Sequence, residues 1–193
     1  MKARSLTKAT YEDLLKVPEN LVAELIDGEL YTWPRPAGPH ARFSSVLGME
    51  IGPPYDLGRN GPGGWWILDE PELHLGEDVI VPDLAGWRRE RMPEIPHDHR
   101  FVIEPDWVCE VISPSTVRVD RGKKARIYAE HDVPWLWLVD PELRTLEVFQ
   151  LAGDFYSMLR VFTGDDVVRA DPFPAVEIDL GAIWGPTPEE PPR

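Results

Sequence analysis

The sequence predicts an α+β or mixed α/β fold in which helices flank one central sheet. The expected elements follow the order helix, β-hairpin, helix, several strands, helix and further antiparallel strands, which suits helices layered on a sheet. A length of 193 residues with 42% hydrophobic residues is enough to bury one substantial core. The absence of internal repeats and of a domain-sized linker predicts a single domain over residues 1–184. A Pro-rich tail, 185–193, is expected to be disordered.

The first part of the chain is expected to form a short helix, a hairpin and a second helix. Thr10 is suited to cap the first helix, because Asp13 falls in its first turn and apolar residues follow at helical spacing. Asp27 and Gly28 separate two apolar runs and predict a type I′ turn between two strands. Apolar residues at helical spacing over 40–51 predict the second helix.

The remaining elements are mainly strands. Residues 65–88 are expected to contain two or three strands, and residues 88–100 form a charged loop. The stretch 106–140 follows the pattern strand, loop, basic helix, strand. Residues 141–144 then connect the last of these strands to an antiparallel partner. A short edge strand is expected within 168–180.

Two carboxylates lie in strongly apolar stretches. Asp83 ends the apolar run that begins at Val79, and Glu110 lies within the apolar strand expected over 106–112. An isolated carboxylate on a buried strand is costly unless it holds a metal or a partner. Hard divalent cations such as Mg²⁺ take one or two protein carboxylates together with waters, so two such acids on neighbouring strands suit a metal site. The alternative is that each acid caps a turn or pairs with a basic residue.

The basic helix expected over 119–131 adds a lysine to these acids. At about 100° per residue, Lys124 shares a stripe with Ile127 and Tyr128, so Lys124 is expected to point inward if those two pack on the sheet. An inward lysine near two carboxylates could bind a phosphate oxygen or polarise a water. The alternative is a lysine whose stem covers the sheet edge while its ammonium stays in water. Lys123 is expected to be solvated.

The net charge of the chain bears on whether nucleic acid is a partner. A formal net charge of −14 argues against tight non-specific affinity for nucleic acid, because phosphate repels such a chain at long range. It does not exclude a metal-dependent site, since the metal brings positive charge. Five basic residues between Arg118 and Arg126 could touch a phosphate backbone, although a solvated helix face is the alternative.

Cysteine content and hydropathy limit the kinds of site and the cellular locations that the sequence allows. The single cysteine, Cys109, excludes an intrachain disulfide framework and a multi-cysteine zinc site. It alternates with Glu110 along the strand and is expected in the core. No apolar run approaches the roughly 20 residues of a membrane span, and the first residues lack the apolar segment of a signal peptide. A cytoplasmic protein with no membrane partner is therefore expected.

Four segments carry a family resemblance: ELIDGEL, VPDLAGW, PDWVCEVISPST and DRGKKARIYAEHDVPWLWLVDPELRTLEVFQL. Together they resemble the Uma-type restriction endonuclease family of the PD-(D/E)xK nuclease superfamily, over residues 10–180. The resemblance implies a restriction endonuclease-like fold, with a mixed central sheet, flanking helices and additional antiparallel hairpins. It also implies that Asp83 and Glu110, with the backbone carbonyl of Val111, coordinate Mg²⁺ or Mn²⁺.

The resemblance assigns three further residues. The superfamily places its lysine two residues after the second acid, where this chain has Ile112. In the Uma-type pattern the lysine lies on the following helix, at Lys124, which agrees with the inward stripe. Glu24 matches an acid that some members use to support the metal. His40 matches a recurrent position without a clear role, and a surface or cap histidine is the alternative.

The resemblance implies a Mg²⁺-dependent endonuclease, a hydrolase acting on ester bonds. DNA is the first expectation for its substrate, and a homodimer is expected because cutting two strands favours two sites. One alternative is a nuclease-fold binding or regulatory protein without activity, which the acidic charge would suit. The other is a metal-dependent hydrolase of a small phosphoester.

Overall fold

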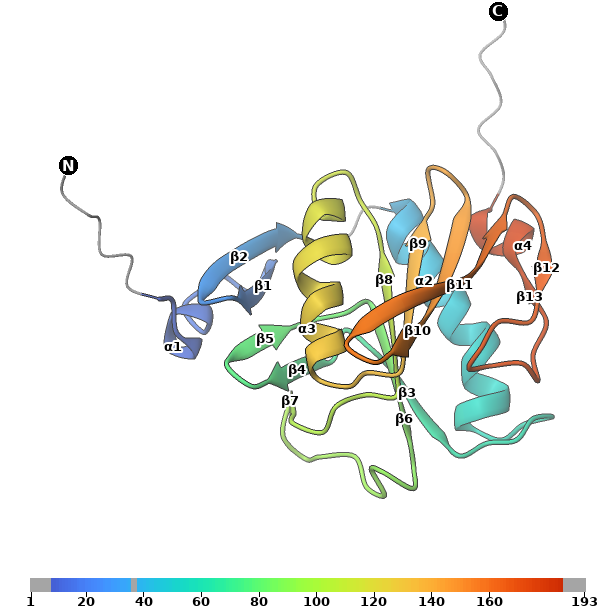
Figure 1. Cartoon of the computed structure of the whole chain (residues 1–193), viewed down its shortest axis with the longest axis horizontal. Helices are drawn as coiled ribbons and strands as arrows, with labels where there is room; N and C mark the ends of the chain where they lie inside the picture. The colour runs from blue at the N-terminus through green and yellow to red at the C-terminus, as the bar shows by residue number, and fades with distance from the viewer. Residues whose placement is uncertain (1–7, 36–37, 186–193) are drawn as a thin grey trace, which may run out of the picture.

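A mixed sheet of six strands forms the centre of the protein, in a computed structural model that describes residues 8–35 and 38–185 (Figure 1). Its strands lie in the order β11-β10-β9-β8-β6-β3. Their bounds are β3 Trp65–Asp69, β6 Leu84–Arg88, β8 Trp107–Val111, β9 Trp135–Asp140, β10 Thr145–Ala152 and β11 Phe155–Thr163. Only the β8–β9 pair is parallel among the pairings of this sheet. The predicted fold class, a mixed sheet with flanking helices and antiparallel hairpins, is confirmed.

A second sheet of five strands packs beside the first, where the sequence predicted one central sheet. Its order is β2-β1-β5-β4-β7. The bounds are β1 Leu21–Ile26, β2 Glu29–Pro34, β4 Glu72–Leu75, β5 Asp78–Ile80 and β7 Arg100–Phe101. Residues 65–88 thus contain four strands rather than two or three. Pro71 and Pro82, which cannot donate to a β-ladder, lie in the connections where the chain passes between the two sheets.

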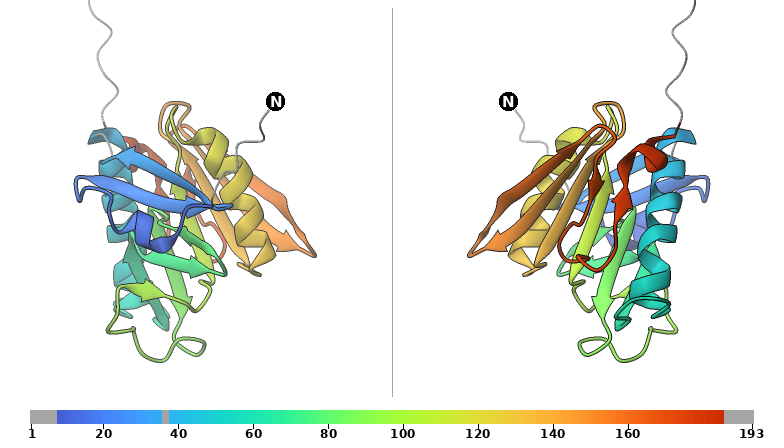
Figure 2. Two further views of the ribbon diagram at one scale, coloured as in Figure 1. Left: turned by 90° about the vertical axis from the view of Figure 1, so that its left-hand side faces the viewer. Right: turned by 90° about the vertical axis from the view of Figure 1, so that its right-hand side faces the viewer.

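Helices cover both faces of the central sheet (Figure 2). On one face lie α2 (Gly38–Ile51), which continues as the π-helical turn η1 (Gly52–Asp56), and α4 (Leu180–Trp184). On the other face the second sheet packs with the π-helical turn η2 (Val119–Lys124) and α3 (Ala125–Glu130). The remaining elements are α1 (Tyr11–Leu14) and the strand pair β12 (Val167–Val168) and β13 (Ile178–Asp179). The helices at 40–51 and 119–131 agree with the predictions, whereas η1 and α4 were not expected.

Local signals at the N-terminal end behave as predicted. Asp27 and Gly28 have φ values of 55° and 72°, the left-handed conformation that a type I′ turn requires at both positions. The Thr10 backbone N–H donates to the Asp13 carboxylate at 3.1 Å, as in a helix-capping box. The hairpin carries Glu24 on β1 to within 2.8 Å of Lys124 in η2.

The structure bears only in part on the expectations about a membrane span and the C-terminal tail. None of the described helices is long and apolar enough to cross a membrane. The tail predicted over 185–193 falls, from residue 186 onward, outside the described residues, and the single domain over 1–184 stays a prediction.

Candidate active site

Asp83 and Glu110 come together where β6 pairs with β8. The antiparallel register joins Leu84 to Cys109, so Asp83, which directly precedes β6, lies beside the end of β8 that carries Glu110. Asp83 itself lies in the link from β5 to β6, not in one strand with Val79 as expected, because the strand stops before Pro82. The Val111 N–H donates to Asp83 Oδ2 at 2.7 Å and fixes the carboxylate against the end of β8.

His40 belongs to the same site. It lies in the first turn of α2, and its Nε2 forms a very short hydrogen bond with Asp83 Oδ1. Both side chains are largely buried, with 17% and 13% of their surface exposed. This largely buried position against Asp83, which lies 43 residues away in sequence, is not that of a surface histidine.

Lys124 points inward, as the helical stripe predicted. Its side chain is 6% exposed, and the ammonium lies 2.8 Å from Glu24, 3.2 Å from Glu110 and 3.3 Å from Asp120. A lysine that only covered the sheet edge would keep its ammonium in water, which this one does not. All three acids are buried as well. The site thus contains one buried cation shared by three buried carboxylates, which we call the lysine cluster.

Neighbouring groups hold the acids of the lysine cluster in place. Glu24 Oε1 accepts from the Val81 N–H at 3.0 Å, and Glu24 Oε2 accepts from the Trp33 indole N–H at 2.7 Å. Glu110 Oε1 accepts from the Tyr128 hydroxyl at 2.5 Å. Glu24 therefore serves here as a partner of the lysine. It is anchored by β2 of the second sheet and by the segment that leads from β5 to β6.

The lysine cluster carries more negative than positive charge. Burial raises the pKa of Glu110 well above its ordinary value. Lys124 opposes that shift, while Asp120, Asp83 and Glu24 add to it. Burial likewise raises the pKa of Asp120, again against the pull of Lys124. For Lys124, burial disfavours the charge, but attraction to Glu110, Glu24 and Asp120 outweighs burial and raises its pKa well above the ordinary value. Lys124 is therefore charged, and burial favours the protonated forms of Glu110 and Asp120.

The raised pKa of Glu110 predicts how stability depends on pH in the absence of divalent ions. A carboxyl whose pKa is higher in the folded state binds more protons folded than unfolded, so stability falls as pH rises from the ordinary glutamate pKa towards the raised one. We expect a loss of up to about 1.4 kcal/mol per pH unit for this group. Urea unfolding in a chelator between about pH 5 and pH 8 measures it. Glu110→Gln should flatten the profile, and an equal slope in both proteins would contradict the assignment.

The oxygen donors of this site determine whether it can hold Mg²⁺. Across 8–35 and 38–185, no three His, Cys, Asp or Glu side chains converge in an arrangement that could hold a metal ion. Mg²⁺ needs less than that, because it usually binds one or two carboxylates and keeps several waters. Asp83 is a hard oxygen donor that lines the pocket, and Glu110 belongs to the neighbouring lysine cluster, in which three carboxylates surround a single ammonium. The residues therefore fit a Mg²⁺ or Mn²⁺ ion.

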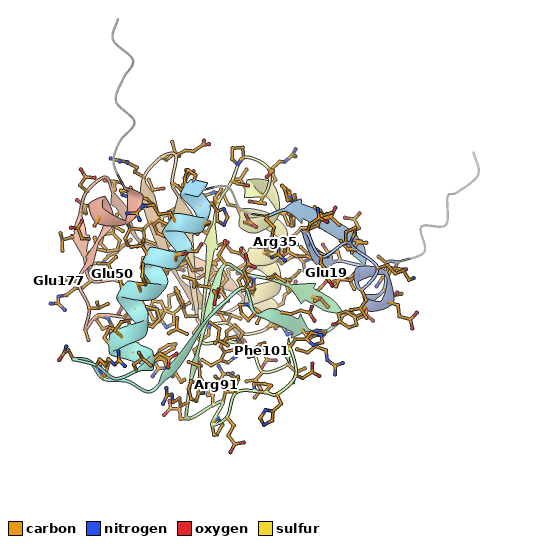
Figure 3. All side chains as sticks on the ribbon, turned by 180° about the vertical axis from the view of Figure 1, so that it is seen from behind. Glu19, Arg35, Glu50, Arg91, Phe101 and Glu177 are labelled. Carbon is orange, nitrogen blue, oxygen red and sulfur yellow. The ribbon has the colours of Figure 1, made fainter. Side chains whose placement is uncertain are left out.

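A pocket of about 210 Å³ gives access to this site. It is lined by the site residues Glu24, His40, Asp83, Val111, Asp120 and Lys124, with Ser113, Ser115 and Thr116 among the other lining residues. Arg35 also lines it, between α2 and the β1–β2 hairpin (Figure 3). The Arg35 guanidinium pairs with Glu70 at 3.0 Å, so its charge is partly satisfied within the chain. Three of the four predicted catalytic residues, Glu24, Asp83 and Lys124, thus line one small pocket. The fourth, Glu110, is buried next to it, 3.2 Å from the Lys124 ammonium.

Sequence reasoning missed two residues of the site. Asp120 lies inside η2 and pairs with Lys124 one turn later. The four-residue spacing between the two was the available signal. Tyr128 was expected only to pack on the sheet, yet its hydroxyl binds Glu110. A tyrosine on the same stripe as an inward lysine was the corresponding signal.

The basic residues of the 118–126 segment are mostly paired within the chain. Arg121 forms two hydrogen bonds to Glu147, both at 2.7 Å. Lys123 lies 2.8 Å from Glu29, so it is surface-lying but not simply solvated. Arg126 pairs with Asp27 and Glu130, each at 2.6 Å. These cations are therefore occupied by acids and do not form a free basic stripe.

Comparisons with known proteins identify a family and a similar fold. The family described as "Uma2: Putative restriction endonuclease" matches residues 9–181. One solved structure, described as a "putative nuclease belonging to DUF820" from Anabaena variabilis, is similar with a TM-score of 0.73 and 24% identity, covering 91% of this chain and 97% of that one. At this identity the second match supports the fold alone. No curated protein matches the chain.

Proposed function

Because the chain belongs to the Uma2 family of putative restriction endonucleases, we propose that it hydrolyses phosphodiester bonds in DNA, with Mg²⁺ or Mn²⁺ as cofactor. One observation carries the proposal: Asp83 accepts from the Val111 N–H at the end of β8, next to Glu110, and the buried ammonium of Lys124 lies 3.2 Å from Glu110. Two neighbouring acids beside a lysine are suited to phosphoryl chemistry, in which positioning and charge stabilisation supply most of the catalysis.

The cofactor would be held by Asp83, Glu110 and the Val111 carbonyl. When bound, such an ion lowers the pKa of a coordinated water and polarises the phosphoryl group. The protein's own contribution starts with Asp83, whose carboxylate is oriented by the Val111 N–H and by His40. Lys124 Nζ would donate to a non-bridging phosphate oxygen, where negative charge builds up during the reaction. Glu24 and Asp120 would keep that ammonium charged and in place.

Metal binding and metal removal test this proposal together. Calorimetric titration with Mn²⁺ should give a binding event that Glu110→Gln abolishes and that the exposed variant Glu142→Gln retains. At least one of two substrates, plasmid DNA and single-stranded DNA, should be cleaved with Mg²⁺ or Mn²⁺ and left intact in a chelator. Absence of both Mn²⁺ binding and cleavage would contradict the proposal and favour a binding module without activity.

A homodimer belongs to the same proposal, because cleavage of both strands of a duplex favours two sites. The edge strand β11 supports it, since Phe155, Met158, Leu159 and Val161 are exposed on a strand whose outer backbone edge has no neighbour in its sheet. Such an edge readily pairs with another chain. Light scattering measures the mass directly.

A further inference from the structure

A second cavity of about 370 Å³ opens beside the catalytic pocket. Its walls include Pro39, Phe43, Ile112, Pro114, Pro141 and Trp184. We call it the apolar side pocket. It shares His40 and Ser113 with the catalytic pocket, so a group seated in it would lie beside that pocket. Its volume falls in the range of roughly 300–1,000 Å³ that small-molecule sites occupy.

The apolar side pocket is built on side chains that are already fixed. The Trp184 indole stacks on Phe43 with ring centroids 4.9 Å apart and an interplanar angle of 26°. The indole N–H donates to the Gly164 carbonyl at 2.6 Å, which orients the ring. Arg42 donates to the Ala182 carbonyl at 2.9 Å and ties α4 to α2. A rigid wall of aromatic and proline rings is suited to a flat heterocycle, because little side-chain freedom is lost on binding.

Charge indicates where affinity for a nucleic acid must come from. The protein has a formal net charge of −14, and Arg121, Lys123 and Arg126 are already paired with acids. Contacts to phosphate are therefore a weak source of binding free energy in this protein. Stacking of a base on an aromatic side chain supplies binding energy that does not depend on a basic surface.

We infer that the enzyme acts on unpaired strands and that the base next to the scissile phosphodiester sits in the apolar side pocket, against Trp184. In a duplex each base is stacked and paired, so it reaches such a pocket only when it is unpaired or extruded. This inference rests on the proposed function for the position of the scissile bond. One site suffices for an unpaired strand, so the inference does not depend on a dimer.

Binding measured without divalent ions tests the inference separately from cleavage. Fluorescence anisotropy in a chelator compares three labelled DNAs: a single strand, the duplex of the same sequence, and a single strand of abasic residues. The single strand should bind at least about tenfold more tightly than either of the others. Trp184→Leu should weaken its binding by about 5- to 150-fold, the equivalent of one base stack, and Trp184→Phe should retain most of it. The control is Leu143→Ala, an exposed residue that does not line the pocket.

A second measurement keeps the inference falsifiable if Trp184→Leu fails to fold. Photocrosslinking of wild-type protein to a single strand that carries 5-bromodeoxyuridine should label the peptide that contains Trp184. Equal binding of duplex and single strand, or labelling confined to other peptides, would overturn the inference. If the duplex is cleaved with Mg²⁺ and Trp184→Leu has no effect, the inference fails and the proposed function stands. If the single strand binds through Trp184 but nothing is cleaved, the proposed function fails instead.

Discussion

Lys124→Met should lower the free energy of unfolding by about 3–5 kcal/mol, because it removes the one ammonium from three buried carboxylates. Methionine has a similar length, so packing changes little and the loss reports on charge. Part of the loss should disappear at low pH, where Glu110 and Asp120, whose pKa values are already raised by burial, take up protons. Urea unfolding at about pH 5 and pH 8 measures both effects.

The neighbouring lysine provides the control for this substitution. Lys123 lies on the same helix and pairs with Glu29, but at the surface. Lys123→Met should therefore leave the unfolding midpoint unchanged within error. Equal losses for both variants would show that helix propensity, and not the buried charges, sets the result. A stable Lys124→Met protein at pH 8 would contradict the ionised lysine cluster.

Asp83→Asn should reduce the rate of DNA cleavage by about 10²–10³-fold or more, a loss typical of removing one electrostatic contact to the reacting group. The amide keeps an oxygen for the Val111 N–H, but it loses the charge that a divalent ion requires. Stability should change by less than about 1.5 kcal/mol, because only one hydrogen bond, that to His40, is put at risk. Cleavage rates with Mg²⁺ and Mn²⁺, together with thermal unfolding, measure the two effects.

Asp106 offers a matched control for Asp83. It is also a buried aspartate near β8, but it accepts from the Arg88 N–H at 2.8 Å and pairs with Arg91 at 3.1 Å, away from the pocket. Asp106→Asn should cost stability and leave the cleavage rate per folded molecule unchanged. If Asp83→Asn cleaves as wild type does, Asp83 is not a ligand and the proposed site is wrong.

Local and periodic signals explain why much of this arrangement was predictable. Asp27 and Gly28 determine their turn by backbone conformation, and the inward position of Lys124 follows from helical periodicity alone. Glu110 was recognisable because a carboxylate within an apolar strand demands a partner. Each of these inferences needs only a few neighbouring residues, together with the family resemblance that paired Asp83 with Glu110.

The features that were not predictable depend on contacts between distant segments. His40 and Asp83 meet only because α2 packs on the central sheet, and no spacing in the sequence encodes that contact. The division into two sheets depends on which strands pair after Pro82, which hydrophobic alternation does not specify. The pairing of Lys123 with Glu29 likewise requires β2 to lie beside η2, far along the chain.

Lys124 joins parts of the molecule that are otherwise separate. Its partners come from β1 in the second sheet, from β8 in the central sheet and from η2 itself. Selection for a folded protein alone would therefore preserve the lysine and its three acids, even in a descendant that no longer cleaves anything. Persistence of these residues in a relative is consequently weak support for catalysis. Substitutions at Asp83, which leave the lysine cluster intact, are the better marker of lost activity.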